Sequence, residues 1–398
     1  DWMAKDYRAG YLLIKDAPEE KIDKIKQAKD HLYLATDDLE KREKAERLFD
    51  ILKNHPKTAF LSVLQFEGIA HKIVKSVSGN YNAYKNYKNK LDSPFKEIYP
   101  DLRNEIFSID SWEERLKSAI IYAGIGNLFD LTHPKALKKI AEDLNLEIDL
   151  SREISKQDLL KLVKGVYKEI RDEGLTIEKD AGIFYGLLAK NSSGTVLYFL
   201  DNHGEIILDE IVVELLLEKG YKVALVARAE TARDDVIVEG AQEIISDNIY
   251  LKKSLTKNTL QVLTDGSYFL GADLSQSDKH LDFQKAWQEA FMYIAKGAGN
   301  LQALQGQKLS IPGFHIRMMK GSRNAYNRLS ELTGEKLSQK SYYEMALFYQ
   351  ESYFTKQAEF ADILEKRNKE NKRLIFLNAN SRFFKAIGGE ALLPGYLE

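Results

Sequence analysis

Acidic and amide side chains stand directly after an apolar run near the middle of this 398-residue chain. Val196 to Leu200 are β-branched, aromatic or aliphatic without interruption, which predicts a strand buried on both faces of a parallel sheet. Asp201 and Asn202 follow, and Ile206 to Lys219 has the apolar spacing of a helix. The two side chains would therefore lie at the carboxyl end of a strand, facing a helix N-terminus. Open α/β sheets bind ligands at such places, and helix N-termini favour anions.

The same turn also has a purely structural interpretation. Asn202 and Glu205 have the spacing of a helix N-cap and its capping-box partner, and a cap needs no function. The pattern of these residues leaves both interpretations open. His203 lies in this turn, and we expect it to face solvent because none of the seven histidines shows metal-ligand spacing.

Polar residues also follow two later apolar runs. Arg228 and the pair Asp234-Asp235 come after Lys222 to Ala227, and Lys296 to Asn300 come after Phe291 to Ala295. Carboxylate and amide oxygens suit Mg²⁺ or Mn²⁺, and a lysine beside a Gly-x-Gly turn suits a phosphate. Together they predict a site where a metal ion polarises a phosphate and orients a nucleophile. Taken singly, the same residues are also explained as a tight turn, a helix cap and a surface charge.

The elements that must position these residues change in type along the chain. Residues 1 to about 185 have helical patterns, and strands alternate with helices from about residue 194, which indicates right-handed crossovers and a parallel sheet. The predicted fold class is α/β, with a three-layer α/β/α core, a mostly parallel sheet and an N-terminal helical domain. Its predicted parts are a helical domain (1–185), an α/β metal- and phosphate-binding core (186–330) and a helical extension (331–398).

Four weaker expectations concern single segments. Glu243 to Ser246 and Phe314 to Met319 are interpreted as short strands. Ser338 to Asn371 is interpreted as a long charged helix. The extension would then return to the sheet with a late strand at Arg373 to Leu377.

Composition excludes several classes of protein. Lys plus Arg is 58 and Asp plus Glu is 60, so the net charge is 58 − 60 = −2 and no basic excess points to nucleic acid. The absence of cysteine excludes disulfides, thiolate zinc sites and cysteine nucleophiles, and it fits a cytoplasmic location. No apolar run approaches the roughly 20 residues that span a bilayer, and no signal peptide is visible. Dinucleotide, phosphate-loop and Gly-x-Ser-x-Gly motifs are also absent.

The motif Leu200-Asp201-Asn202-x-Gly204-Glu205 resembles the metal-dependent damage-control phosphatase family. This family was formerly called domain of unknown function 89 and includes proteins described as acidic-residue methyltransferases. The similarity covers roughly Ser108 to Asn300, in the correct order and with plausible spacing. Its further motifs are Gly126-Asn127-x-x-Asp130, Asp265-Gly266-Ser267 with Gly271 and Asp273-Leu274, and Lys296-Gly297-x-Gly299-Asn300.

The resemblance implies a divalent ion held by Asp201, Asn202 and Asp235. Asp235 is preferred to Asp234 because Asp235-Val236 fits the family's motif better. The ion would be Mg²⁺ or Mn²⁺, or alternatively Co²⁺ or Ni²⁺. Asp201 and Asp235 would be catalytic, with Asp201 either the nucleophile or only a ligand. Lys296 would bind the substrate phosphate, and the other implied substrate-binding residues are Asn127, Asp130, Glu205, Arg228 and Asn300.

The implied reaction is hydrolysis of a small phosphorylated metabolite, such as a sugar phosphate or a damaged cofactor precursor. One alternative is an S-adenosylmethionine-dependent carboxyl methyltransferase, which ranks low because no glycine loop offers an adenosine site. Another is a non-catalytic phosphometabolite-binding protein. The chain departs from the family in lacking an N-terminal cysteine pair and in its loop Ala229 to Arg233. These departures concern the substrate more than the fold, and the sequence indicates no oligomeric state.

Overall fold

The computed structural model describes residues 13–129, 134–148, 154–172, 177–304, 309–318 and 345–349. Its centre is a six-stranded sheet in the order β3-β2-β1-β4-β5-β6. All neighbouring strands are parallel except the edge pair β5 and β6. The α/β fold with a mostly parallel sheet is therefore confirmed. The strands are β1 (Thr195–Phe199), β2 (Lys222–Ala227), β3 (Leu260–Thr264), β4 (Ala290–Lys296), β5 (Gly313–Met318) and β6 (Met345–Tyr349).

Burial of β1 on both faces explains its unbroken apolar run. All five of its residues are buried. Val196 and Tyr198 belong to the core on one face of the sheet, and Leu197 and Phe199 belong to the core on the other face. Successive strand residues point to opposite faces, so a central strand covered by helices on both sides needs an apolar residue at every position.

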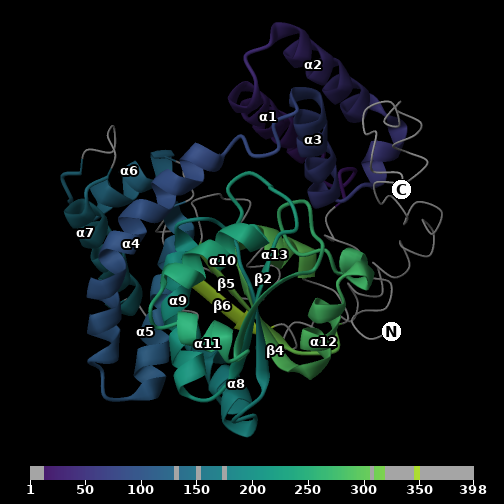
Figure 1. Ribbon diagram of the computed structural model, residues 1–398. Coiled ribbons are helices and arrows are strands. Elements are labelled where there is room, and N and C mark those ends of the chain that lie inside the picture. The colour runs from purple at the N-terminus through teal and green to yellow at the C-terminus, as the bar shows by residue number, and fades with distance from the viewer. Residues whose placement is uncertain are drawn as a thin grey trace.

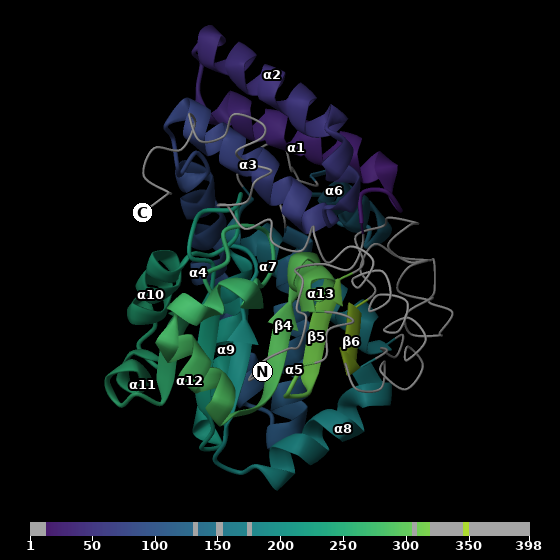
Figure 2. The same ribbon diagram turned by 90° about the vertical axis from the view of Figure 1, so that its right-hand side faces the viewer.

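Helices cover both faces of the sheet (Figures 1 and 2). The first face packs against helices whose side chains share one large core with β1 and β2. They are α4 (Lys85–Phe107), α5 (Trp112–Gly126), α6 (Pro134–Asp143), α7 (Lys156–Asp172), α8 (Ile177–Lys190), α9 (Glu205–Glu218), α10 (Val238–Asp247) and, at its margin, α11 (Lys252–Thr256). The second face packs against η3 (Leu274–Lys279), α12 (Leu281–Glu289) and α13 (Gly297–Leu304).

The strand order places a switch point at β1. The chain leaves β1 through α9 to reach β2 on one side, whereas β4 pairs with β1 on the other side. Connections that diverge in this way leave a crevice at the carboxyl ends of the two strands, where open α/β sheets bind ligands. The segments that follow β1 and β4 therefore lie where such a fold is expected to bind its ligand.

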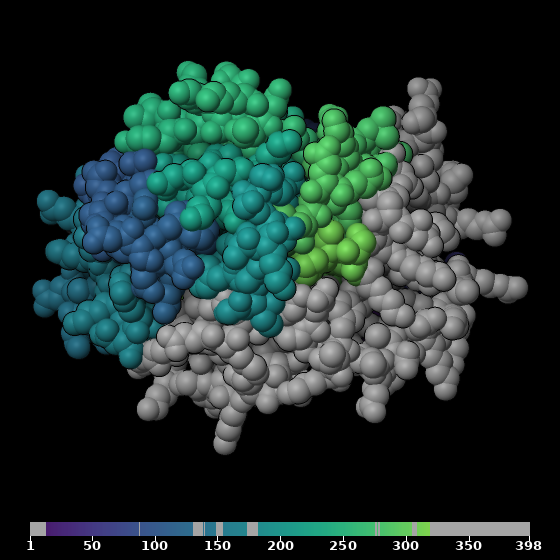
Figure 3. Space-filling model, turned by 90° about the horizontal axis from the view of Figure 1, so that it is seen from below, coloured from purple at the N-terminus to yellow at the C-terminus, as the bar shows by residue number. Residues whose placement is uncertain are grey.

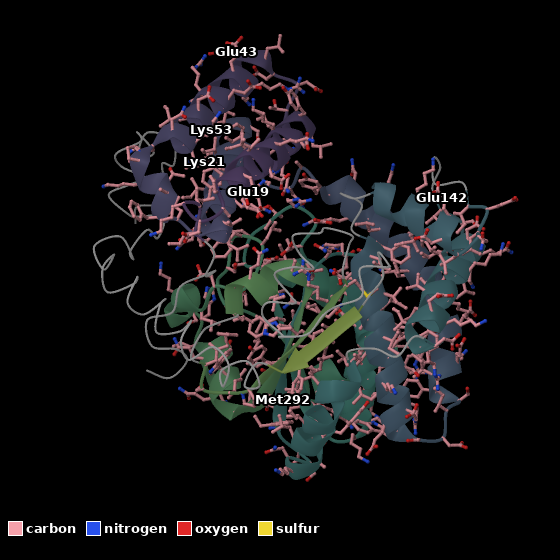
Figure 4. The ribbon with its side chains drawn as sticks, turned by 180° about the vertical axis from the view of Figure 1, so that it is seen from behind. Glu19, Lys21, Glu43, Lys53, Glu142 and Met292 are labelled. Carbon is pink, nitrogen blue, oxygen red and sulfur yellow. The ribbon has the colours of Figure 1, made fainter. Side chains whose placement is uncertain are left out.

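Three N-terminal helices form a unit with its own apolar core, and a short 3₁₀ turn, η1 (Pro56–Phe60), joins the last two of them. They are α1 (Pro18–Ala35), α2 (Leu39–Asn54) and α3 (Val63–Ser78). Glu43 and Lys53 lie at this end of the molecule, whereas Met292, near the start of β4, lies toward the other end (Figure 4). The carboxyl ends of the parallel strands therefore point toward the three-helix unit. Seen from below, the coloured surface belongs to α4 and later elements (Figure 3).

Two of the weaker expectations are wrong. Glu243 to Ser246 is not a strand but part of α10, because Ala241, Ile244 and Ile245 are spaced to bury one helical face. Met345–Tyr349 lies within the stretch interpreted as helical, but it forms strand β6 and pairs with β5. By contrast, β5 confirms the strand expected at Phe314 to Met319. The late strand at Arg373 to Leu377 lies outside the described residues.

Within the described ranges, no helix is both long enough and apolar enough to cross a bilayer.

Candidate metal and phosphate site

The turn between β1 and α9 is built around Gly204. Its φ of 81° lies in the left-handed region that glycine tolerates, and α9 begins at the next residue, Glu205. Asn202 does not cap α9 through its side chain as the N-cap interpretation requires. The carboxylate half of the capping box is present, because Glu205 Oε1 accepts hydrogen bonds from Asn202 N and Nδ2 at 3.1 and 3.0 Å.

The expected metal ligands lie on two main-chain segments that run side by side. Asn202 and Asp235 form an isolated antiparallel bridge, and Val236 N donates to Asp201 O at 2.8 Å. Asp201 and Asn202 are each 8% exposed and Asp235 is 1% exposed. Residues from the ends of β1 and β2 are thus brought together, with two carboxylates and one amide oxygen on adjacent backbone positions.

Gly297 gives the Asp201 carboxylate its space. A Cβ atom at Gly297 would lie 1.6 Å from Asp201 Oδ2, and the φ of Gly297 is 76°. Only a residue without a side chain fits at this point. Asn127, at the end of α5, donates its amide to Asp201 Oδ2 at 3.0 Å and to Glu205 Oε1 at 3.3 Å. The carboxylate of Asp201 therefore lies against the start of α13 on one side and is held by the C-cap residue of α5 on another.

Arg228 is fully buried and connects the three strand ends. Its Nε donates to Asp235 Oδ2 at 2.8 Å, and its Nη2 donates to Asn300 Oδ1 at 3.0 Å. Asn300 in turn donates to the carbonyl oxygens of Leu200 and Lys296 at 2.9 and 2.8 Å. Within the described part of the chain, Arg228 Nη1 is a buried donor with no hydrogen-bond partner. The guanidinium thus retains one donor for a further acceptor.

Lys296 is buried between two carboxylates. Its ammonium donates to Asp209 Oδ1 at 2.7 Å and to Glu205 Oε2 at 3.0 Å. Burial alone would lower the pKa of Lys296, but Asp209 and Glu205 raise it above its ordinary value. An ammonium group has three N–H bonds, so these two contacts leave one for another acceptor.

The donor set fits a hard divalent cation. Burial raises the pKa of Asp235, an effect that Arg228 opposes, so its carboxylate is costly to bury without a further positive charge. The described residues contain no group of three or more His, Asp or Glu side chains arranged as a metal site. A metal site here therefore needs the Asn202 amide oxygen beside Asp201 and Asp235, a ligand type that Mg²⁺ and Mn²⁺ accept.

Most of the expected site residues converge at the carboxyl edge of β1, β2 and β4. They are Asn127, Asp201, Asn202, Glu205, Arg228, Asp235, Lys296 and Asn300. Asp130 lies outside the described residues. The roles of these residues toward metal and substrate stay predictions.

Three neighbouring residues were not expected from the sequence. Asp209 shares Lys296 with Glu205. From α4, Lys88 contacts the main chain of Asp235 after β2, and Asp92 contacts His203 in the turn after β1. The helical spacing of α9 could have indicated Asp209, because it lies one turn after Glu205 on the same face. The charged residues of α4 show no pattern that distinguishes Lys88 and Asp92 from the others.

The expectation that His203 faces solvent is wrong. His203 is 8% exposed, and its Nδ1 lies 2.9 Å from Asp92 Oδ2. The neighbouring Gly204 N–H donates to Asp92 Oδ1 at 2.7 Å. The imidazole is buried because it pairs with the Asp92 carboxylate. Asp92 lies on a helix more than 100 residues earlier in the chain, so the local sequence around His203 could not show this contact.

Comparison with known proteins gives one family. A family model described as "Damage-control phosphatase ARMT1-like domain" matches residues 18–328. A damage-control phosphatase of Archaeoglobus fulgidus is 25% identical over 239 residues, which cover 60% of this chain and 69% of that protein. An uncharacterized protein of Methanocaldococcus jannaschii is 25% identical over 256 residues, which cover 62% of this chain and 70% of that protein.

A solved structure supports the same fold. The crystal structure of a DUF89 (domain of unknown function 89) family protein from Pyrococcus horikoshii aligns with a TM-score of 0.57 and 20% sequence identity. The alignment covers 78% of this chain and 94% of that one. The resemblance drawn from the sequence motifs is confirmed.

Proposed function

Since the chain belongs to the damage-control phosphatase ARMT1-like domain family, we propose that it is a divalent-metal-dependent phosphatase acting on a small phosphorylated metabolite. A sugar phosphate or a damaged cofactor precursor is the proposed class of substrate. The observation that carries the proposal is the convergence of Asp201, Asn202 and Asp235 on adjacent main-chain segments. We propose Mg²⁺ or Mn²⁺ as the ion and the cytoplasm as the location.

The proposed metal ligands are the side chains of Asp201, Asn202 and Asp235. A divalent ion at this point would polarise the phosphate and offset the negative charge of the reacting group. Asn127 holds Oδ2 of Asp201 through its amide at 3.0 Å, which fixes the direction of the carboxylate. A fixed carboxylate serves equally as a ligand and as a nucleophile toward phosphorus, and we leave both roles to Asp201.

Two cations are proposed to bind the substrate phosphate. Arg228 Nη1 is a buried donor that lacks a hydrogen-bond partner among the described residues, and a phosphate oxygen would satisfy it. Lys296 has one N–H beyond its contacts with Glu205 and Asp209. The carboxylates of this pair keep Lys296 protonated, because they raise its pKa. Asn127, Glu205 and Asn300 would orient these groups, and Asp130 stays in the proposed substrate-binding set.

The proposal is tested by phosphate release from a panel of sugar phosphates with Mg²⁺, Mn²⁺, Co²⁺ or Ni²⁺. Asp201→Ala should reduce metal-dependent turnover by at least about 1000-fold, since it removes a ligand or the nucleophile. Asp282→Ala is the matched control, because Asp282 is an exposed acid on α12, and it should keep full activity.

Two outcomes would contradict the proposal. Turnover that persists in Asp201→Ala would place the chemistry elsewhere. A folded wild-type chain that binds Mn²⁺ and phosphorylated ligands without turnover on the whole panel would instead indicate a binding protein.

A further inference from the structure

We infer that helix α4 positions the proposed metal site, with Lys88 and Asp92 holding the two turns that carry its ligands. This inference rests on the proposed function, because it assigns these two residues a role toward the metal. Their hydrogen bonds go to the main chain of one proposed ligand and to the two residues that follow another. Each acts through the main chain or a side chain next to a ligand.

Asp92 holds the turn that follows Asp201 and Asn202. Its Oδ1 accepts from Gly204 N at 2.7 Å, and its Oδ2 lies 2.9 Å from His203 Nδ1. Gly204 is the N-cap of α9 and has no side chain with which to cap the helix. A carboxylate from α4 therefore takes over the capping role, at the end of α9 where negative charge is favoured.

Lys88 holds the other turn. Its Nζ donates to the main-chain oxygen of Asp235 at 3.0 Å, and only 3% of the residue is exposed. The contact fixes the backbone of a proposed ligand and leaves the ligand's carboxylate for the ion. Residues four apart lie on the same face of a helix. One turn of α4 thus contacts both ligand-bearing turns.

Lys96, the next residue on this face of α4, provides a control for these two contacts. Lys96 lies four residues after Asp92, and its Nζ pairs with Asp247 Oδ2 at 2.9 Å on α10. This ion pair is well exposed, with 42% and 62% of the two side chains accessible. It also joins α4 to the α/β core, but it touches neither ligand-bearing turn. Removing Lys96 therefore perturbs the docking of α4 but removes none of the hydrogen bonds that Lys88 and Asp92 make to the two turns.

The test measures Mn²⁺ binding to the full chain by titration calorimetry, together with thermal unfolding in the absence of metal. Residues that orient metal ligands typically change metal affinity by about 10- to 100-fold. We therefore expect Asp92→Leu and Lys88→Met to weaken Mn²⁺ binding about 10-fold or more. Asp92→Asn should bind Mn²⁺ nearly as the wild type does, because an amide can accept from Gly204 N and donate to the His203 ring. Lys96→Met should leave Mn²⁺ affinity unchanged.

The outcomes separate this inference from the proposed function. Wild-type affinity in both Asp92→Leu and Lys88→Met would overturn the positioning role while leaving the metal site in place. Equal loss of affinity in Lys96→Met would show that any weakening of α4 docking suffices, and it would also overturn the inference. A wild-type chain that binds no Mn²⁺ would remove the proposed metal site, and the inference with it. If Asp92→Leu fails to fold, Lys88→Met with Lys96→Met decides the question.

Discussion

Helix α9 carries two buried acidic surfaces that are stabilised in different ways. Toward the strand ends, Glu205 and Asp209 share the ammonium of Lys296 at 3.0 and 2.7 Å. Toward α4 and α10, Glu210 Oε2 accepts from the neutral amide of Asn248 at 2.9 Å. We call these the lysine side and the amide side of α9. Because Asp209 and Glu210 are adjacent in sequence, one helix presents both arrangements at the same depth of burial.

The two sides differ in the pKa of their carboxyl groups. Burial raises the pKa of Asp209 to about 6, against the opposing effect of Lys296. Burial raises the pKa of Glu210 to about 8, and the hydrogen bond from Asn248 opposes this only in part. A buried cation therefore keeps a carboxylate closer to its charged form than a neutral amide does. The lysine side is therefore expected to carry charge near neutral pH, whereas Glu210 on the amide side is expected to hold a proton there.

Removing the cation from the lysine side should have the largest effect. Lys296→Met leaves Glu205 and Asp209 buried without a counter-charge, and breaking a buried pair in this way costs about 3–5 kcal/mol. We expect a loss of this size in the free energy of unfolding, measured by urea denaturation at neutral pH. Lys285→Met, at an exposed position of α12, is the control and should change stability little. A loss below about 1 kcal/mol would mean that the two carboxyl groups bind protons instead, as on the amide side.

Removing one neutral donor from the lysine side should have a smaller effect. Tyr198 is buried in β1, and its hydroxyl donates to Asp209 Oδ1 at 2.8 Å. Because a hydrogen bond to a charged group is worth about 2 kcal/mol, Tyr198→Phe should destabilise the chain by that amount in the same urea experiment. The destabilisation caused by Tyr198→Phe should be smaller in a Lys296→Met background, because Asp209 then lacks the ammonium that stabilises its charged form. An equal effect in both backgrounds would argue that Asp209 is neutral even beside the lysine.

Protonation of Glu210 on the amide side should make the free energy of unfolding depend on pH. The pKa of Glu210 rises from its ordinary value of 4.5 to about 8 on folding. Between these two values the folded state holds a proton that the unfolded state has lost, so stability falls as pH rises. The fall from this group is at most about 1.4 kcal/mol per pH unit, and it ends above the folded-state pKa. Glu210→Gln should reduce the slope, as measured by urea unfolding at several pH values.

An exposed acid on the neighbouring helix provides the control for this measurement. Glu239 lies at the surface of α10, so Glu239→Gln should leave the slope of stability against pH as it is in the wild type. A Glu210→Gln chain with the wild-type slope would show that other groups set the pH dependence, and that the amide side does not hold a proton at neutral pH.

The sequence predicted those parts of the fold and site that depend on local pattern. The continuous apolar run before Asp201 predicted β1, and the polar residues after it predicted a turn at the carboxyl edge of the sheet. The same logic placed Arg228 after β2 and Lys296 at the end of β4, and these strand ends meet in the structure. Strand ends of a parallel sheet converge because the topology brings them to one edge, so no detailed knowledge of side-chain packing was needed.

The parts that were missed depend on tertiary contacts. Ile244 and Ile245 look like a strand in a short window, but they bury one face of α10 together with Ala241. His203 has a hydrophilic neighbourhood in sequence, yet Asp92 from α4 buries it. Neither partner is visible locally, because packing against distant elements overrides the propensity of a short segment. The role of α4 could not be read from its charges alone.

The contacts that complete the site join residues far apart in sequence, which limits when they can form during synthesis of the chain. Gly204 and Asp92 are 112 residues apart, and Asp235 and Lys88 are 147 residues apart. Asn300, which holds the end of β1 through Leu200, is 100 residues further along the chain than its partner. During synthesis, α4 leaves the ribosome long before any of the residues that it will hold. The complete set of contacts around the proposed site therefore requires the chain through Asn300, so these contacts cannot all form before that residue has emerged.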